Sequence, residues 1–234
     1  MSVSEKQFIN EDLLAPNVVE IDVDPTDIAE LAPIASYLQR SGTRDGLVDI
    51  GGGIRLFATH PGWKSDIVWI SQADRAGYDY FENIFRRLHI ADNVARYIAH
   101  DRAIVMYSGF FVTRRTCTEP NFHFDWVDCG NDAFTYLGPV SANCSELGLV
   151  YRDLRGGIGQ YTYRPDKGLV FGDYFLHSTA PGRASGTTVL LSFTFGTDRM
   201  ENWEKIARTA ASQGMFHRRP DGQFMTSGGK PSGY

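Results

Sequence analysis

The second half of the chain is divided into short apolar segments separated by tight turns. Between about residues 102 and 197, runs rich in β-branched and aromatic residues alternate with turns rich in Gly, Pro and Asp. The clearest runs are 133–140, 160–163 and 187–195. Short strands at such regular spacing are typical of antiparallel sandwiches and jelly rolls. The sequence therefore predicts a mainly β fold with a jelly-roll core and helices packed on one sheet.

The segments that flank this core read as strands and helices of a single domain, 1–234. We expect an N-terminal strand and helix flank at about 18–100, the jelly-roll core at about 102–197, and a C-terminal helix with a flexible tail at 200–234. Apolar residues recur at helical spacing in 28–40, 79–100 and 200–212, which predicts three amphipathic helices. Gly51-Gly52-Gly53 lacks the spacing of a phosphate-binding loop and predicts a hairpin turn. The tail from Gly214 is expected to be flexible or to form a lid.

Composition excludes several classes of protein. The chain has 234 residues, 42% hydrophobic and 22% charged, with a formal net charge of −5, which is ordinary for a soluble globular protein. No basic stripe is visible, so nucleic acid is not an expected partner. No apolar stretch is long enough for a membrane span, and the N-terminus lacks a secretory signal. The three cysteines contain no Cys-x-x-Cys, so a reduced, cytoplasmic setting is expected. The protein is expected to be a monomer or a homodimer.

One short motif carries most of the functional information. Residues i and i+2 of a strand point to the same side, so a strand at Phe122–Trp126 would present His123 and Asp125 together and turn Phe124 into a core. A third ligand must then come from another strand. His177 is suitable, since it precedes a turn-rich loop, 178–186, and a buried strand. Two imidazoles and one carboxylate are the facial triad that holds Fe(II). The sequence predicts a metal site of these three residues.

A His-x-Asp pair alone is a weak signal, because many surface strands carry one, and a lone His before a strand is more often a hydrogen-bonded core or loop residue. The combination is more specific: an aromatic-flanked His-x-Asp, a long gap, and Gly172-Asp173 shortly before the second His.

With this combination, the segment from about 104 to 197 resembles the Fe(II)/2-oxoglutarate-dependent dioxygenases, whose core is a double-stranded β-helix. The resemblance implies that His123, Asp125 and His177 bind iron, with 2-oxoglutarate and O2 as co-substrates. It also implies hydroxylation, or another oxidation, of an unactivated C–H of a small-molecule metabolite, in biosynthesis, with release of succinate and CO2. Halogenating relatives replace the carboxylate by a small residue, so Asp125 favours oxygenation.

The same resemblance predicts a basic residue that anchors 2-oxoglutarate, and here the chain departs from the family. An Arg or Lys is usual at the start of the strand after the distal His, which is near Thr187 in this sequence. Arg183 is the nearest basic residue, and a guanidinium can hold a carboxylate through two parallel hydrogen bonds. We therefore expect Arg183, Arg115 and Thr187 to bind the co-substrate, with Arg183 as the first choice for the anchor. Arg114 and Arg199 are rival candidates.

Substrate contacts are predicted from the aromatic residues that surround the motifs. Trp126, Tyr136 and Tyr174 are candidates to contact a small organic substrate. Metal ligands also need hydrogen-bonding partners that orient them. Asp173, Ser178 and Thr179 are close enough in sequence to serve.

Two other functions compete with the oxygenase. The missing strand-start Arg favours a cupin-type metal dioxygenase or isomerase that uses no 2-oxoglutarate. Cupins, however, typically use more His ligands, and this chain has six His in total. A non-catalytic jelly-roll binding protein is the other alternative, and the intact His123, Asp125 and His177 argue against it.

Overall fold

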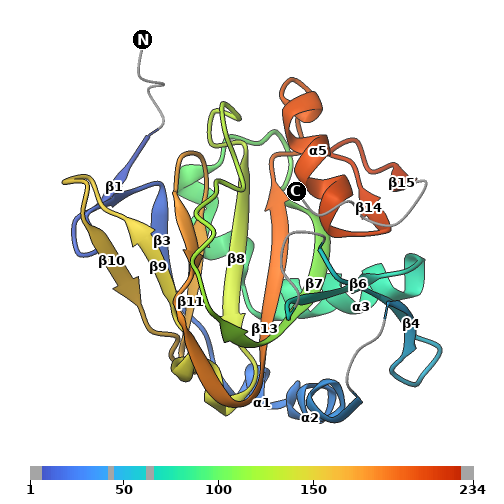
Figure 1. Ribbon diagram of the computed structural model, residues 1–234. Helices are drawn as coiled ribbons and strands as arrows, with labels where there is room; N and C mark the ends of the chain where they lie inside the picture. The colour runs from blue at the N-terminus through green and yellow to red at the C-terminus, as the bar shows by residue number, and fades with distance from the viewer. Residues whose placement is uncertain (1–6, 42–44, 62–65, 228–234) are drawn as a thin grey trace.

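A computed structural model describes residues 7–41, 45–61 and 66–227. Its largest element is an eight-stranded antiparallel sheet in the order β3-β11-β8-β13-β7-β6-β5-β4 (Figure 1). The bounds of its strands are β3 Val18–Asp22, β4 Gly46–Asp49, β5 Arg55–Thr59, β6 Val68–Gln72, β7 Val105–Cys117, β8 Ala133–Pro139, β11 Lys167–Phe171 and β13 Gly182–Gly196.

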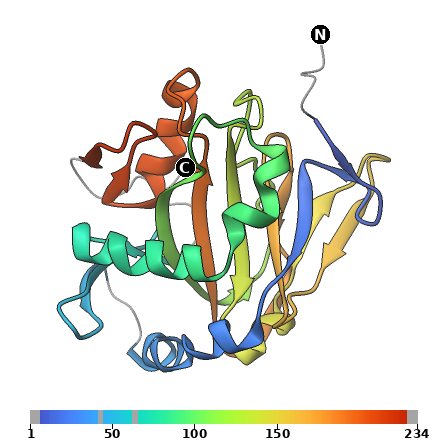
Figure 2. The same cartoon turned by 180° about the vertical axis from the view of Figure 1, so that it is seen from behind.

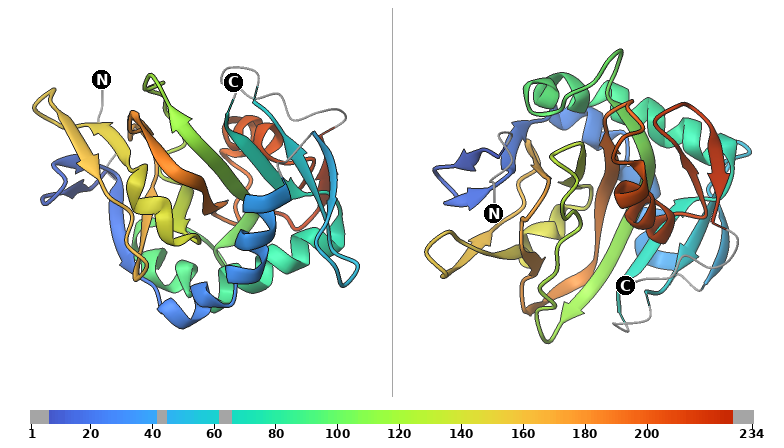
Figure 3. Two further views of the ribbon diagram at one scale, coloured as in Figure 1. Left: turned by 60° about the horizontal axis from the view of Figure 1, so that its bottom comes forward. Right: turned by 90° about the horizontal axis from the view of Figure 1, so that it is seen from above.

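A smaller sheet faces part of the large one. It contains three antiparallel strands in the order β10-β9-β12, with bounds β9 Leu149–Arg152, β10 Ile158–Tyr161 and β12 His177–Thr179. Figure 3 shows the two sheets set at an angle to each other. Short hairpins lie at the two ends of the chain, β1 Ile9–Asn10 with β2 Ala15–Pro16, and β14 Phe216–Arg218 with β15 Phe224–Thr226. The predicted mainly β jelly-roll fold with flanking helices is confirmed.

Helices lie on both faces of the large sheet, and most of them cover its rear face (Figure 2). The helices are α1 Pro25–Ala29, α2 Ala32–Ser41, α3 Arg75–Arg87, α4 Ile90–Val94 and α5 Trp203–Gln213, with short 3-10 turns η1 Ala95–Tyr97 and η2 Ala142–Glu146. On α3, Phe85 packs against Phe193 of β13, with ring centroids 5.4 Å apart. Because strand side chains alternate, the neighbours of Phe193 face the other side of the sheet, away from this core. Helix α5 lies on that other side (Figure 3).

Several predicted boundaries are wrong for identifiable reasons. The helix expected over 79–100 begins at Arg75 and is broken at His89, whose positive φ of 51° is incompatible with a continuous helix. The tail after α5 is not without structure as far as residue 227, since it forms the β14–β15 hairpin; residues 228–234 lie outside the described residues. The Gly triplet is a hairpin turn between β4 and β5, as predicted, and all three glycines have positive φ.

Two further observations concern the cysteines and the lengths of the helices. Cys117, Cys129 and Cys144 are buried and free. Over the described ranges, no helix combines the length and the apolar content that crossing a membrane requires.

Candidate metal centre

His123, Asp125 and His177 converge at one point between the two sheets. One ligand atom from each side chain can be chosen so that all three lie within 4.8 Å of one another. The Nε2 atom of His123 lies 3.5 Å from Oδ1 of Asp125, and the two imidazole rings are 4.6 Å apart between centroids. The sequence motif thus becomes a compact cluster of two imidazoles and one carboxylate, which are donor atoms for a single metal ion.

The backbone around the cluster differs from the prediction. Residues 122–126 do not form a strand; only an isolated bridge joins His123 to His177, through backbone hydrogen bonds of 3.0 and 3.1 Å. Phe124 does not enter a core either, because it is 38% exposed. The distal side is more regular than expected, since β12 starts at His177 and β13 at Gly182, where a loop over 178–186 was predicted. The paired backbone of the two histidines therefore holds the ligands in register.

Backbone carbonyls fix the tautomer of both histidines. Nδ1 of His123 lies 2.8 Å from the carbonyl oxygen of Asn121, and Nδ1 of His177 lies 3.0 Å from that of Phe175. A carbonyl only accepts hydrogen bonds, so each Nδ1 carries a proton and donates it. In the neutral ring, Nε2 then keeps its lone pair, which is the arrangement of a metal-ligating histidine whose other nitrogen is held by the protein.

The surroundings of His177 also keep its ring neutral. Its side chain is enclosed by Phe171 and Phe175, whose ring centroids lie 4.5 and 5.4 Å from that of the imidazole. Burial, and then the neighbouring His123, lower the pKa of His177 to about 4. At neutral pH the lone pair of Nε2 is therefore not blocked by a proton, and a metal ion would not need to displace one.

A hydrogen-bond relay orients the carboxylate of Asp125. The hydroxyl of Thr135, on β8, donates to Oδ2 of Asp125 at 2.7 Å and accepts from Nε1 of Trp126 at 3.0 Å. The hydroxyl of Thr209, on α5, donates to the backbone carbonyl of Asp125 at 3.0 Å. Oδ1 remains on the side of His123. Sequence reasoning missed Thr135 and Thr209, because both are remote in sequence from the motif.

Replacing Thr135 by Val is expected to weaken metal binding about 10- to 100-fold, the usual effect of losing a residue that orients a ligand. The change removes the donor to Asp125 and leaves the buried Nε1 of Trp126 without its acceptor, so the free energy of unfolding should also fall by about 1–3 kcal/mol. Titration of Fe(II) or Co(II) into the variant, with a urea unfolding curve, measures both effects.

Thr194→Val is the matched control. Thr194 is also buried on β13, directly paired with Thr135, but its hydroxyl donates to the backbone carbonyl of Ser108 at 3.4 Å. It should lose some stability and keep its metal affinity. Equal metal affinities of Thr135→Val and the unaltered protein would show that the relay does not position Asp125.

The three side chains open into a cavity between the sheets. The cavity and the open solvent at its mouth together hold about 670 Å³ of empty space. Its polar lining includes Asn121, Ser178, Thr179, Ser192 and Gln213. Most of its remaining wall is apolar or aromatic, from Ile67, Trp69, Phe110, Val112, Leu137, Leu149, Tyr163 and Leu190.

One arginine, Arg114 on β7, reaches the cavity wall. Its side chain is 8% exposed, and its Nε lies 3.3 Å from Oδ1 of Asp66 and donates to the carbonyl of Thr116 at 2.8 Å. A smaller adjoining space is lined by Arg114, Thr188 and Tyr163. Burial raises the pKa of the Tyr163 phenol above its usual value, so this hydroxyl stays protonated. Arg114 thus brings a buried positive charge, paired with Asp66, to the wall of the cavity.

The other candidates for binding 2-oxoglutarate do not line this cavity. Arg183 is exposed, on the edge of β13 where it pairs with Thr116 of β7. Arg115 points the opposite way from Arg114 and contacts the carbonyl of Ser185. The carbonyl of Thr187 accepts hydrogen bonds from Gln39 and Asn143. Arg199 pairs with Asp101.

The predicted substrate contacts also lie outside the cavity lining. Trp126 is buried behind the cluster and Tyr136 faces the helix-covered core, where its ring lies 5.8 Å from that of Phe193. The hydroxyl of Tyr174 donates a hydrogen bond to the carboxylate of Asp128.

Asp173 was predicted to orient a metal ligand. Its carboxylate instead accepts a hydrogen bond from the backbone N–H of Gly130.

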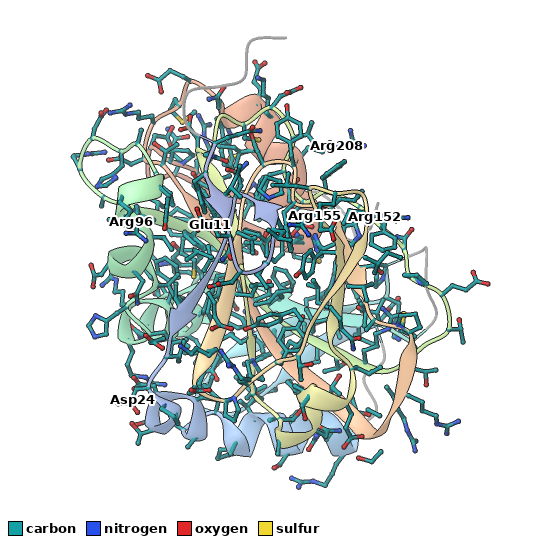
Figure 4. The ribbon with its side chains drawn as sticks, turned by 90° about the vertical axis from the view of Figure 1, so that its left-hand side faces the viewer. Glu11, Asp24, Arg96, Arg152, Arg155 and Arg208 are labelled. Carbon is teal, nitrogen blue, oxygen red and sulfur yellow. The ribbon has the colours of Figure 1, made fainter. Side chains whose placement is uncertain are left out.

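Ser178 supports the site in a different way from the one predicted. Its hydroxyl accepts from the backbone N–H of Asn121 at 2.7 Å, which ties the loop before His123 to β12. Thr179 lines the cavity beside it. Beyond this loop, the guanidinium of Arg152 lies 5.1 Å from the ring centroid of Phe122; Figure 4 shows Arg152 and Arg155 on the β9–β10 side of the molecule.

Solved structures with the same fold can now be compared. EctD from S. alaskensis, in its apoform, matches with a TM-score of 0.56 and 11% identity, over 81% of this chain and 76% of that one. The non-heme alpha ketoglutarate dependent epimerase SnoN from nogalamycin biosynthesis matches with a TM-score of 0.53 and 10% identity, over 78% and 79%. The carbocyclase SnoK of the same pathway, also non-heme and alpha ketoglutarate dependent, matches with a TM-score of 0.54 and 10% identity, over 81% and 85%.

No family model and no curated protein matches the sequence. The structural likeness establishes the fold: the chain shares its fold with EctD and with the alpha ketoglutarate dependent enzymes SnoN and SnoK, and it carries a His-x-Asp…His cluster. The resemblance predicted from the sequence is confirmed at this level.

Proposed function

We propose that the protein is an Fe(II)- and 2-oxoglutarate-dependent oxygenase that oxidises a C–H bond of a small molecule. The observation that carries the proposal is the convergence of His123, Asp125 and His177 within 4.8 Å at the wall of a cavity. SnoN, which shares the fold, has been solved with Fe3+, alpha ketoglutarate and nogalamycin RO. We take the chain to act as a single domain.

The residues present fit an iron ion. Two imidazoles and one carboxylate are the donor set of non-heme Fe(II) oxygenases, and such a set leaves other coordination positions open. Both Nδ1 atoms are already engaged by carbonyls, so Nε2 of His123, Nε2 of His177 and Oδ1 of Asp125 are the natural ligand atoms. Thr135 holds the second carboxylate oxygen, Oδ2, which limits Asp125 to one ligand atom.

The residues also fit a dicarboxylate co-substrate. Arg114 replaces Arg183 as the proposed anchor, because it is the arginine that lines the cavity. Arg114 is directly paired with Thr188 of β13, next to Thr187, near which the family usually places its basic residue. Directly opposed residues of two antiparallel strands lie on the same face of the sheet. The neighbouring strand would thus supply a positive charge beside Thr187 and Thr188, where β13 has no basic residue, and the Tyr163 hydroxyl would donate beside it.

When bound, iron and 2-oxoglutarate would supply the oxidising chemistry, with release of succinate and CO2. The chain's own residues would bind and orient these groups and exclude water. The apolar wall from Trp69 and Phe110 would hold the carbon skeleton of the substrate near the metal ligands. Neighbours of the fold include an epimerase and a carbocyclase, so hydroxylation is the proposed outcome and epimerisation or ring formation is the second candidate.

Anaerobic addition of Fe(II) and then 2-oxoglutarate tests the proposal. We expect one equivalent of iron to bind and a weak visible charge-transfer band to develop when 2-oxoglutarate is added. The second readout is succinate. Under O2 and without substrate, the enzyme should slowly decarboxylate 2-oxoglutarate, and the succinate formed can be measured. Iron binding without the band would favour the cupin-type dioxygenase or isomerase, and absence of iron binding would favour a binding protein.

A further inference from the structure

Two buried polar atoms of the cavity lining have no partner within the described part of the chain. They are Oε1 of Gln213 and Oγ of Ser192. Their residues are 4% and 1% exposed, and both line the cavity that contains the metal ligands. A buried polar atom without a hydrogen bond costs folding free energy, so native proteins seldom keep one without a reason. Two such atoms in the wall of one cavity point to a ligand that pairs with them.

Gln213 is placed next to the metal centre by helix α5. It is the last residue of that helix and follows Thr209 by four positions, so both side chains lie on the same face. Thr209 donates to the backbone carbonyl of Asp125. Gln213 therefore stands one helical turn from the residue that fixes the metal-binding loop, and its amide closes the cavity on the α5 side.

Ser192 lies on the floor of the same region. On β13 it pairs with Phe110 of β7 on one side and with Leu137 of β8 on the other. Both neighbours are apolar and line the cavity. The Ser192 hydroxyl is thus a polar group with an apolar residue on each neighbouring strand, which is the pattern of a site that selects both shape and hydrogen bonding.

Much of the remaining cavity wall is apolar, and few of its side chains are charged. Ile67, Trp69 and Phe110 form a separate cluster, with the rings of Trp69 and Phe110 6.0 Å apart. Apart from the histidines, the single cationic side chain among the described lining residues is Arg114, which already pairs with Asp66 and is assigned above to the co-substrate. A substrate carboxylate or phosphate would find no second cation there.

We propose that Gln213 and Ser192 select the substrate, and that it is an uncharged, mostly apolar small molecule bearing an amide, or a comparable N–H or O–H group. That the ligand is a substrate rests on the proposed function, whereas the binding site itself is inferred from the geometry alone. Oε1 of Gln213 would accept from the ligand's N–H, and the Ser192 hydroxyl can donate or accept. The apolar body of the ligand would pack on Trp69 and Phe110.

Three small probes test this on the metal-free, full-length protein: cyclohexanecarboxamide, methyl cyclohexanecarboxylate and cyclohexanecarboxylate. They share a ring and differ in having an N–H donor, no donor, or a charge. Dissociation constants come from ligand-observed NMR titrations. We expect the amide to bind most tightly. Gln213→Met, which keeps the length of the side chain, should weaken amide binding about 3- to 10-fold, the size of a neutral hydrogen bond, and leave the ester unchanged.

Gln223→Met is the matched control, since this glutamine lies in the β14–β15 turn region and does not line the cavity; it should keep the preference for the amide. Equal binding of amide and ester by the unaltered protein, or no saturable binding of the amide, would overturn the proposal. So would an amide preference that survives Gln213→Met.

Protein stability gives a second readout that needs no ligand. Because Ser192→Ala removes an unpartnered buried hydroxyl, it should shift the urea midpoint of unfolding upward or leave it unchanged, while amide binding weakens. A clear downward shift would mean that the hydroxyl stabilises the fold, and would overturn its assignment to a ligand. Amide selectivity in a protein that gives no iron and 2-oxoglutarate band would support this site and reject the oxygenase, so the two failures are distinguishable.

Discussion

His177→Ala is expected to abolish iron binding and all activity that depends on it. The loss should exceed the roughly 10- to 100-fold effect of removing a residue that merely orients a ligand, because the substitution removes one of three donor groups. His177 is also the most enclosed of the three, at 5% exposure. Titration of Fe(II) under anaerobic conditions, followed by metal analysis of the desalted protein, measures the effect.

The same variant will lose some stability, and this must be separated from the loss of the metal. Truncation leaves a hole beside Phe171 and Phe175, against which the imidazole packs. His217→Ala is a suitable control, since His217 is also 5% exposed and burial lowers its pKa to about 4 as well. It lies on β14 and outside the cavity lining. It should be destabilised comparably and bind iron normally. Full iron binding by His177→Ala would exclude the proposed centre.

The fold was largely predictable because its signals are local. Alternating apolar residues and turn residues mark β8, β10 and β13 within a few positions, and an amphipathic period marks α3 and α5. The errors occur where the backbone conformation differs from the one that the local sequence pattern predicts. The apolar stripe of α3 continues past His89, although the backbone does not, since the residue adopts a left-handed conformation that the sequence pattern does not reveal. The C-terminal hairpin is stabilised by tertiary packing, such as that of Phe224 against Tyr78, which the local sequence pattern does not reveal.

The candidate ligands were predictable for a similar reason, although their local geometry was not. The i, i+2 spacing of His123 and Asp125 suggested a strand, but the loop is held by a single bridge to His177 and by Ser178. The residues that complete the surroundings are non-local. Thr135 reaches Asp125 from β8, and Gln213 comes from a helix beyond the core. Nothing in their own sequence neighbourhoods distinguishes them, so their roles depend on tertiary contacts.

The anchor of the co-substrate illustrates the limit most clearly. Distance along the chain from His177 favoured Arg183, whereas the cavity contains Arg114, far earlier in the sequence. The two are linked by the pairing of β7 with β13, whose register shifts between Arg183 and Thr188. Arg183 pairs with Thr116, and an uninterrupted register would place Ser185 opposite Arg114; the irregularity places Thr188 there instead. A cross-strand register with a bulge cannot be read from one sequence.

Arg114→Met should therefore raise the concentration of 2-oxoglutarate needed for half-maximal turnover by about 10- to 100-fold. A hydrogen bond to a charged group contributes about 1.5–3 kcal/mol, and each 1.4 kcal/mol corresponds to a factor of ten. Methionine keeps much of the apolar stem, so the wall of the cavity is preserved. Iron binding without 2-oxoglutarate should be unaffected, because Arg114 is not among the ligand atoms. The charge-transfer band, titrated with 2-oxoglutarate, reports the affinity directly.

Arg183→Met and Arg115→Met are the controls, and both should leave that affinity unchanged because neither side chain lines the cavity. A large effect in Arg183→Met with none in Arg114→Met would return the anchor to the strand-start region.

Asp66 offers a further test, in which the opposite effect on affinity is expected. Its carboxylate lies 3.3 Å from Nε of Arg114 and competes with a bound dicarboxylate for the guanidinium. Asp66→Asn removes that competing charge, so 2-oxoglutarate should bind as tightly as in the unaltered protein or more tightly. Opposite responses from the two partners of one ion pair would assign the positive charge to the co-substrate, because a purely structural ion pair would lose stability in both variants without changing affinity.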